Sequence, residues 1–264
     1  MCSIEGGGLI ESSAVVDRNA EIEEGVSIGA FSIIGSDVQI GKGTVIGPHV
    51  VIKGPTILGE DNRIFQFTSI GEDPQDKKYA QELTRLEIGD RNTVREFSTI
   101  HRGTQQDQSI TQIGDDNLFM AYTHVAHDCV VGNHVTMANG ASLAGHVRLD
   151  DYAILGGFTL VHQFTKIGRL SFSAMGSAIT QDVPPFVMVG GRPTRPHGIN
   201  SVGMERSGCT PEVTQQIRRA YKILYKSNLK LEDAIDEMEE IAGECTELSH
   251  MVNFLRNVTR GILR

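Results

Sequence analysis

The sequence predicts an all-β parallel β-helix built from six-residue repeats, followed by a small α-helical domain. An aliphatic residue recurs at every sixth position from residue 10 to 70 and again, in phase, from 88 to 100. A second series, shifted by one residue, runs from 113 to 179, and Ser173 is its only non-apolar member. A small or β-branched residue stands four positions after most aliphatics of the first series. Period six with one aliphatic and one small position is the signature of a hexapeptide β-helix.

Each hexad supplies a short strand and a corner. The aliphatic side chain fills the interior, and the small residue fits the narrowing at the corner, where glycine permits backbone angles that other residues avoid. Three hexads complete one triangular coil of about 18 residues, and coils stack at the strand spacing of ~4.8 Å. About 24 hexads would therefore form about eight coils.

Two polar stretches, residues 72–86 and 104–112, interrupt the series because they cannot supply interior aliphatic side chains. We expect both to loop out of the β-helix. Loops of repeat proteins often carry function. A functional role is the favoured interpretation of the first stretch, whereas a solvated loop without a role is favoured for the second.

The repeat stops near Pro184, so we predict a β-helical domain over residues 1–190 and a helical domain over residues 191–264. The second domain is too thin to stand alone, and it should pack on the β-helix or on a neighbouring subunit.

Three amphipathic segments define the helical domain. Thr210 is placed as the N-cap of the first helix because Pro211 follows it. A second helix is predicted over residues 231–242, and Thr246 is expected to cap a third.

Composition restricts the function classes. A formal net charge of −9 argues against nucleic acid as a general partner. No apolar run approaches the ~18–20 residues that span a bilayer, and no leader segment is visible, so we expect a soluble cytoplasmic protein. The four cysteines form no CxxC pair, which indicates reduced thiols. Cys129 occupies an inward position, and core packing is favoured over a nucleophilic role.

Histidines gather between residues 123 and 146, where His124, His127, His134 and His146 lie close together in sequence. Imidazoles titrate near neutral pH, so this cluster is open to three interpretations: a catalytic site, a metal site or an accident. His127 should point out of the β-helix because Val125 and Cys129 point inward. A coil of about 18 residues places Gly145 over His127, which leaves room above the ring.

Six short motifs resemble one family closely. The most specific is His-Val-Ala-His-Asp-Cys over residues 124–129. The others lie at residues 75–80, 100–104, 161–164, 181–185 and 198–200. Together with the hexads, they resemble the UDP-N-acetylglucosamine O-acyltransferases that open lipid A synthesis, over essentially the whole chain.

The resemblance implies a left-handed β-helix and a homotrimer with active sites between neighbouring chains. It also implies transfer of an (R)-3-hydroxyacyl chain from acyl carrier protein to the 3-hydroxyl of UDP-N-acetylglucosamine. Neither a cofactor nor a metal is expected.

The resemblance also implies roles for individual residues. His127 would be the general base, Asp128 would orient it, and the Gly145 amide would stabilise the oxyanion. His49 and His134 have no motif support and are expected to be solvated. Substrate-binding roles fall on Asp76, Lys78, His101, His124, His146, His162, Gln163, Asn200 and Arg206.

The sequence departs from the family pattern in places. Ser201-Val202 stands where an aliphatic residue and a glutamate are expected, and Ser207 stands where a second basic residue is common. Met175 stands where long-chain members have glycine. Because a bulky side chain there would shorten the acyl groove, we expect a preference for chains on the order of ten carbons.

Six basic residues stand out against the acidic background and could form a docking patch for acyl carrier protein or a scattered solvated face. They are Arg148, Lys166, Arg169, Arg218, Arg219 and Lys222.

Three alternative functions remain open at this point. They are a zinc enzyme of the β-helical carbonic anhydrase type, a related N-acyltransferase or acetyltransferase, and a non-catalytic scaffold.

Overall fold

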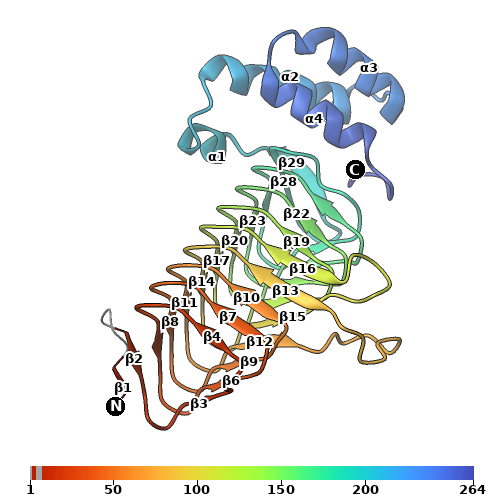
Figure 1. Cartoon of the computed structure of the whole chain (residues 1–264). Coiled ribbons are helices and arrows are strands. Elements are labelled where there is room, and N and C mark those ends of the chain that lie inside the picture. The colour runs from red at the N-terminus through yellow and green to blue at the C-terminus, as the bar shows by residue number, and fades with distance from the viewer. Residues whose placement is uncertain (1, 4–7) are drawn as a thin grey trace.

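The computed structural model describes residues 2–3 and 8–264, and most of that chain is a left-handed parallel β-helix (Figure 1). Short strands stack into three sheets, one for each side of the coil. Within the described residues, the first sheet has the order β1-β2-β5-β8-β11-β14-β17-β20-β23-β26-β28-β29. Successive coils pair in register, as His124 does with Ser142 and Val125 with Leu143.

The first sheet is bounded as follows: β1 Cys2–Ser3, β2 Leu9–Ile10, β5 Ser27–Ile28, β8 Val45–Ile46, β11 Arg63–Ile64, β14 Thr93–Val94, β17 Leu118–Phe119, β20 Thr136–Met137, β23 Ile154–Leu155, β26 Phe172–Ser173, β28 Val187–Gly190 and β29 Arg195–Ile199. The second comprises β4 Glu21–Ile22, β7 Val38–Ile40, β10 Thr56–Leu58, β13 Arg85–Ile88, β16 Ile110–Ile113, β19 Val130–Val131, β22 Arg148–Leu149 and β25 Lys166–Ile167. The third comprises β3 Val15–Val16, β6 Ile33–Ile34, β9 Val51–Ile52, β12 Ser69–Glu72, β15 Thr99–His101, β18 His124–Val125, β21 Ser142–Leu143, β24 Leu160–Val161 and β27 Ala178–Ile179.

The predicted hexad aliphatics form the core. From Ile28 to Ile179 they are buried, whereas Ile10 and Ile22 are only partly buried near the first coil. Ser173, the polar member of the second series, is also buried, and its hydroxyl pairs with Thr159 at 2.9 Å. Cys129 is fully buried and burial raises the pKa of its thiol to about 12, which confirms the core interpretation.

A ladder of asparagines ties the coils together at one corner. Asn92 Nδ2 donates to the Gly114 carbonyl, and the Asn117 amide donates to Asn92 Oδ1. Asn62 and Asn117 repeat the same contacts on the coils before and after. These side chains are buried, and the backbone groups at the corner have no strand partner. Each asparagine therefore supplies hydrogen bonds that water would otherwise make to those groups.

A second corner carries a column of aromatic rings at positions with positive φ. Phe31, His49, Phe67, Phe97 and Tyr122 stack in sequence, with ring centroids 4.9–5.2 Å apart. His49 is exposed, as predicted, but its ring is sandwiched between two phenylalanines. His134 is likewise exposed and stacks on Tyr152.

Two excursions leave the β-helix where the repeat is interrupted, between β12 and β13 and between β15 and β16 (Figure 1). Both end earlier than the residue pattern suggests, because β13 begins at Arg85 and β16 at Ile110. Arg102 anchors the first excursion: its Nη1 donates to the carbonyls of Gly54 and Gly71, and its Nη2 donates to Asp73 and Tyr79.

Four helices follow the β-helix: α1 Ser201–Arg206, α2 Pro211–Lys226, α3 Leu231–Ala242 and α4 Thr246–Arg256. Because β29 pairs with β28, the sheet extends to Ile199, past the expected boundary at residue 190. In the chain as described, no helix has both the length and the apolar character required to cross a bilayer.

Helix starts agree with the prediction in part. Thr210 caps α2 by accepting a hydrogen bond from the Val213 amide, as expected. The expectation that Thr246 caps α4 is wrong, since Cys245 is the N-cap and Thr246 is the first helical residue. The sequence pattern did not predict α1.

The helical domain packs on the last coils through its C-terminal tail. Lys166 Nζ donates to the Asn257 carbonyl at 2.6 Å, and the Leu263 amide donates to the Asp182 carbonyl at 3.0 Å. α2 packs on β29. The expected packing on the β-helix is therefore made within one chain.

We predict that Asn92→Ala lowers the free energy of unfolding by about 2–4 kcal/mol, because it leaves two buried backbone groups without partners. Chemical denaturation would measure this change. Asn19→Ala, at an exposed asparagine, should stay within about 0.5 kcal/mol. Equal effects of the two substitutions would contradict a structural role for the ladder.

Candidate active site

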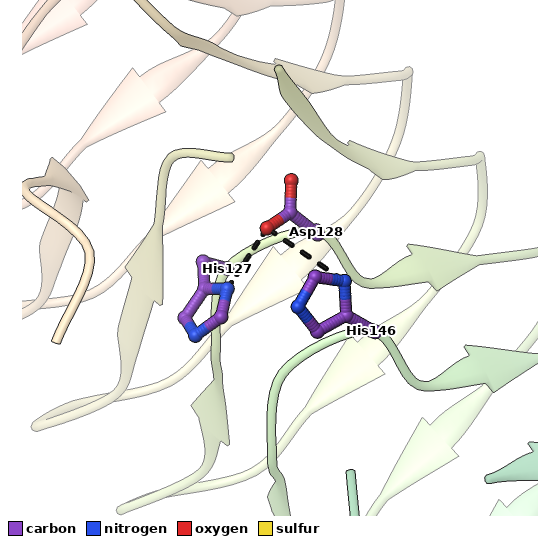
Figure 2. A group of neighbouring side chains, drawn as sticks. All are labelled: His127, Asp128 and His146. Carbon is purple, nitrogen blue, oxygen red and sulfur yellow. Dashed lines mark hydrogen bonds and ion pairs between the residues drawn. The ribbon is translucent and has the colours of Figure 1, made fainter. Parts of the chain in front are cut away.

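His127 and Asp128 occupy the corner between β18 and β19 (Figure 2). Asp128 has φ of 58°, a conformation that turns the chain sharply and brings the two neighbouring side chains together. His127 Nδ1 lies 2.9 Å from Asp128 Oδ2. Because a carboxylate can only accept, Nδ1 carries the proton and Nε2 faces away with a free lone pair.

Asp128 is held on both oxygens. The Thr104 amide donates to Oδ1 at 2.8 Å, and the Thr104 hydroxyl donates to Oδ2 at 2.6 Å. Burial alone would raise the pKa of Asp128, but the hydrogen bonds from His127 and Thr104 outweigh it and lower this pKa below its usual range. Asp128 is therefore a fixed anion that can orient the His127 ring and stabilise its protonated form.

Gly145 lies directly over the His127 ring, as the coil length predicts. A Cβ atom at this position would come within 2.5 Å of His127 Cε1. Any side chain at this position would collide with the ring, so glycine is required sterically here. Within the described residues, the Gly145 amide donates to no protein acceptor, so it is available to a ligand.

His146 lies beside His127 with the ring planes nearly perpendicular and the centroids 5.1 Å apart. Its Nδ1 lies 2.7 Å from Asp107 Oδ2, and its face stacks on Phe164. Asp107 and Thr104 both belong to the excursion between β15 and β16. This stretch therefore contacts two members of the histidine cluster, directly at His146 and through Asp128 at His127.

His101 and His124 form a second histidine pair on β15 and β18, 5.1 Å apart. His124 Nδ1 contacts the Thr99 hydroxyl at 2.7 Å, whereas the buried Nδ1 of His101 has no hydrogen-bond partner in the described chain. Burial lowers the pKa of His101 to about 4, and the nearby His124 adds to this effect. Burial also lowers the pKa of His124. Both rings are therefore neutral at pH 7.

The other predicted site residues lie elsewhere in the chain. Asp76 and Lys78 are on the first excursion, where Asp76 Oδ1 accepts from the Lys78 amide. Arg206 is exposed at the end of α1. His162 and Gln163 are exposed after β24, one coil beyond Gly145.

Two predicted residues have surroundings that the sequence did not indicate. Asn200 is buried, caps α1 through Oδ1 and donates through Nδ2 to the Leu170 carbonyl. It therefore joins the helical domain to the β-helix, and its role toward a substrate stays a prediction. Met175 is 82% exposed, and its role in selecting chain length stays a prediction.

Sequence reasoning missed Asp107, Thr104, Arg102 and Phe164. Thr104 and Arg102 lie in a motif that was recognised, but the excursion separates Thr104 from Asp128 by 24 residues, so coil spacing did not connect them. No pattern pointed to Asp107.

His127, Asp128 and His146 have potential ligand atoms within 4.8 Å of one another. A zinc site would have to use these three residues. Both Nδ1 atoms already face carboxylates, and Asp128 is further held by Thr104. The geometry fits two oriented imidazoles, each with its outer nitrogen free.

Comparisons with known proteins agree with this geometry. Residues 182–263 match the family model for domain 2 of UDP-N-acetylglucosamine O-acyltransferase, and residues 19–54 and 110–145 match the bacterial transferase hexapeptide model. The acyl-[acyl-carrier-protein]–UDP-N-acetylglucosamine O-acyltransferase of Alkalilimnicola ehrlichii is 55% identical, over 97% of this chain and 99% of its own. The chain belongs to the UDP-N-acetylglucosamine O-acyltransferase family.

Further relatives support the same assignment. The acyltransferase of Herminiimonas arsenicoxydans is 54% identical over 97% of this chain and 99% of its own. The solved structure of LpxA from Acinetobacter baumannii superposes with a TM-score of 0.95 at 46% identity, covering 97% of this chain and all of that one. The fold class and the family predicted from the motifs are confirmed, and the protein is an acyltransferase rather than a zinc hydratase or a scaffold.

We predict that His101 makes stability depend on pH. Because the folded pKa is about 4 and the usual value is 6.5, only the unfolded chain takes up the proton between these limits. Stability from this group is therefore complete above pH 6.5 and falls by up to about 3 kcal/mol as the pH drops toward 4. Denaturation series at several pH values should show a flatter dependence for His101→Gln than for wild type.

His49→Gln, at an exposed histidine on another corner, serves as the control and should keep the wild-type slope. Parallel curves for His101→Gln and wild type would contradict the prediction.

Proposed function

We propose that this enzyme transfers an (R)-3-hydroxyacyl chain from acyl carrier protein to the 3-hydroxyl of UDP-N-acetylglucosamine, the first step of lipid A biosynthesis. The observation that carries the proposal is the His127 ring, oriented by Asp128 and lying beneath Gly145. Relatives more than 50% identical are named for both substrates, acyl carrier protein and UDP-N-acetylglucosamine. The motifs and the geometry supply the residue roles.

In this proposal, His127 Nε2 accepts the proton of the sugar hydroxyl as its oxygen attacks the thioester carbonyl. Asp128 accepts the Nδ1 hydrogen bond throughout and stabilises the imidazolium that forms. When the tetrahedral intermediate collapses, the C–S bond breaks and His127 returns its proton to the departing thiolate. The products are an ester and a free carrier thiol, and no cofactor is needed.

The oxyanion of the intermediate forms beside the His127 ring, close to the Gly145 backbone. The Gly145 amide, which donates to no acceptor in the described chain, would stabilise the negative charge. His101, His124 and His146 surround this point with imidazoles that can bind substrate hydroxyls.

We propose that copies of the chain associate as a homotrimer. Large apolar side chains remain exposed along the β-helix, among them Phe31, Phe67 and Phe158. Lys78 and Arg206, two of the substrate-binding candidates, are exposed to solvent, where a neighbouring copy can contact them.

The six basic residues divide into separate groups. Arg218, Arg219 and Lys222 line a cavity of about 950 Å³ between α1 and α2. Arg148 and Lys166 line another cavity, where Lys166 donates to the Asn257 carbonyl. Arg169 lies over the Tyr152 ring. We propose the α2 group as the docking site for acidic acyl carrier protein. We also propose a cytoplasmic location for the enzyme, together with its carrier.

Mass spectrometry of the product from UDP-N-acetylglucosamine and a set of hydroxyacyl carriers tests the proposal. An ester at the sugar 3-hydroxyl is expected, and His127→Ala should lower the rate by about 10²–10⁴-fold. An amide product, or full activity of His127→Ala, would overturn it.

The same assay tests the proposed preference for short chains. Carriers with chains of about ten, twelve and fourteen carbons should react in that order, because each excluded CH₂ loses ~0.8 kcal/mol. Met175→Gly should extend the range toward longer chains. A wild-type preference for the longest chain would contradict the role given to Met175.

We predict that Gly145→Ala lowers kcat/KM by about 10²-fold, because its Cβ would displace the His127 ring. Gly157→Ala is the matched control, since its Cβ would meet only the Asn139 carbonyl at 3.4 Å. Steady-state kinetics of both variants, with circular dichroism to confirm folding, would check this. Similar losses in the two variants would argue against a steric requirement at residue 145.

A further inference from the structure

The excursion between β15 and β16 contacts two successive coils of the candidate site. Thr104 makes two hydrogen bonds to Asp128 on the next coil, and Asp107 contacts His146 one coil further on. The excursion is folded back on Thr104, whose carbonyl accepts from the amides of Asp107 and Ser109. These bonds fix where the Asp107 carboxylate lies.

We propose that Asp107 is a positioning residue that acts through His146. This inference rests on the proposed acyl transfer and assigns Asp107 the task of holding the His146 ring in one tautomer. His146 Nδ1 lies 2.7 Å from Asp107 Oδ2, and a carboxylate acceptor requires the proton on Nδ1. Nε2 of His146 is then a hydrogen-bond acceptor toward the site.

The two imidazoles have different carboxylate partners. His146 Nδ1 lies 3.8 Å from Asp128 Oδ2, and His127 Nδ1 lies 2.9 Å from the same atom. Two donors thus face one oxygen, and Figure 2 shows both rings on one side of the carboxylate. His146 Nδ1–H donates to Asp107 at the shorter distance, and Asp128 accepts from His127.

The surroundings leave the His146 ring little other freedom. Phe164 stacks on it with centroids 4.3 Å apart, and the His127 ring stands against its edge. Its side chain is 14% exposed. With both Nδ1 atoms bound to carboxylates, the two Nε2 atoms form a pair of acceptors, one to take the proton and the other to hold a substrate hydroxyl.

The experiment measures the tautomer directly. In protein labelled with ¹⁵N-histidine, the ring nitrogen shifts of His146 should report Nδ1–H in wild type. Asp107→Ala should release this ring to the Nε2–H form, which free imidazole favours, and leave His127 as Nδ1–H. Its kcat/KM for acyl transfer should fall about tenfold or more, as expected for the loss of a charge-assisted hydrogen bond.

Two further variants separate positioning from general loosening of the loop. Asp107→Asn keeps an acceptor oxygen, so it should restore the Nδ1–H form and most of the activity. Gln108→Ala, at the exposed neighbouring residue, should change neither.

Three results would overturn the inference: an Nε2–H form of His146 in wild type, an unchanged tautomer in Asp107→Ala, or loss of Nδ1–H at both rings. The tautomer is read without turnover. If wild type fails to acylate UDP-N-acetylglucosamine, the proposed function fails while the tautomer measurement still tests Asp107.

Discussion

The interior of the coil admits one aliphatic side chain per hexad, and this constraint determines the rest of the molecule. Because every coil must present its aliphatics in the same three directions, residues one coil apart lie above one another. Backbone hydrogen bonds, such as that from the Ala126 amide to the Leu143 carbonyl, then fix which residues of successive coils lie next to each other. Gly145 lies over His127 for this reason alone, so the site inherits its geometry from the packing of the core.

Coil spacing explains why much of the fold and the centre of the site were predictable. The hexad series identifies the β-helix, and its period places Gly145. The contact of His127 with Asp128 follows from their adjacency at a corner, although the sequence could not show that φ of Asp128 is positive. The helical domain was recognised from capping and apolar faces, but α1 is too short and too polar to produce such a pattern.

The parts that could not be predicted depend on excursions from the repeat. Thr104, Asp107 and Arg102 act through loops whose length bears no relation to the coil period. Their partners are 24, 39 and 29 residues away, respectively. Periodicity carries no information about such contacts, since a loop can reach any nearby coil. The stretch with the least sequence pattern thus proves to support the most ordered polar cluster.

The excursion between β15 and β16 also absorbs a change of phase. The aliphatic series before it and after it differ by one residue, yet Ile110 pairs with Arg85 and Thr99 pairs with His124 as regular neighbours. Both ends are therefore fixed by the stack, and the chain between them is free to change in length and composition at little cost to folding. Sequence changes in this one loop can therefore alter the polar contacts to the site without changing the coils that carry His127.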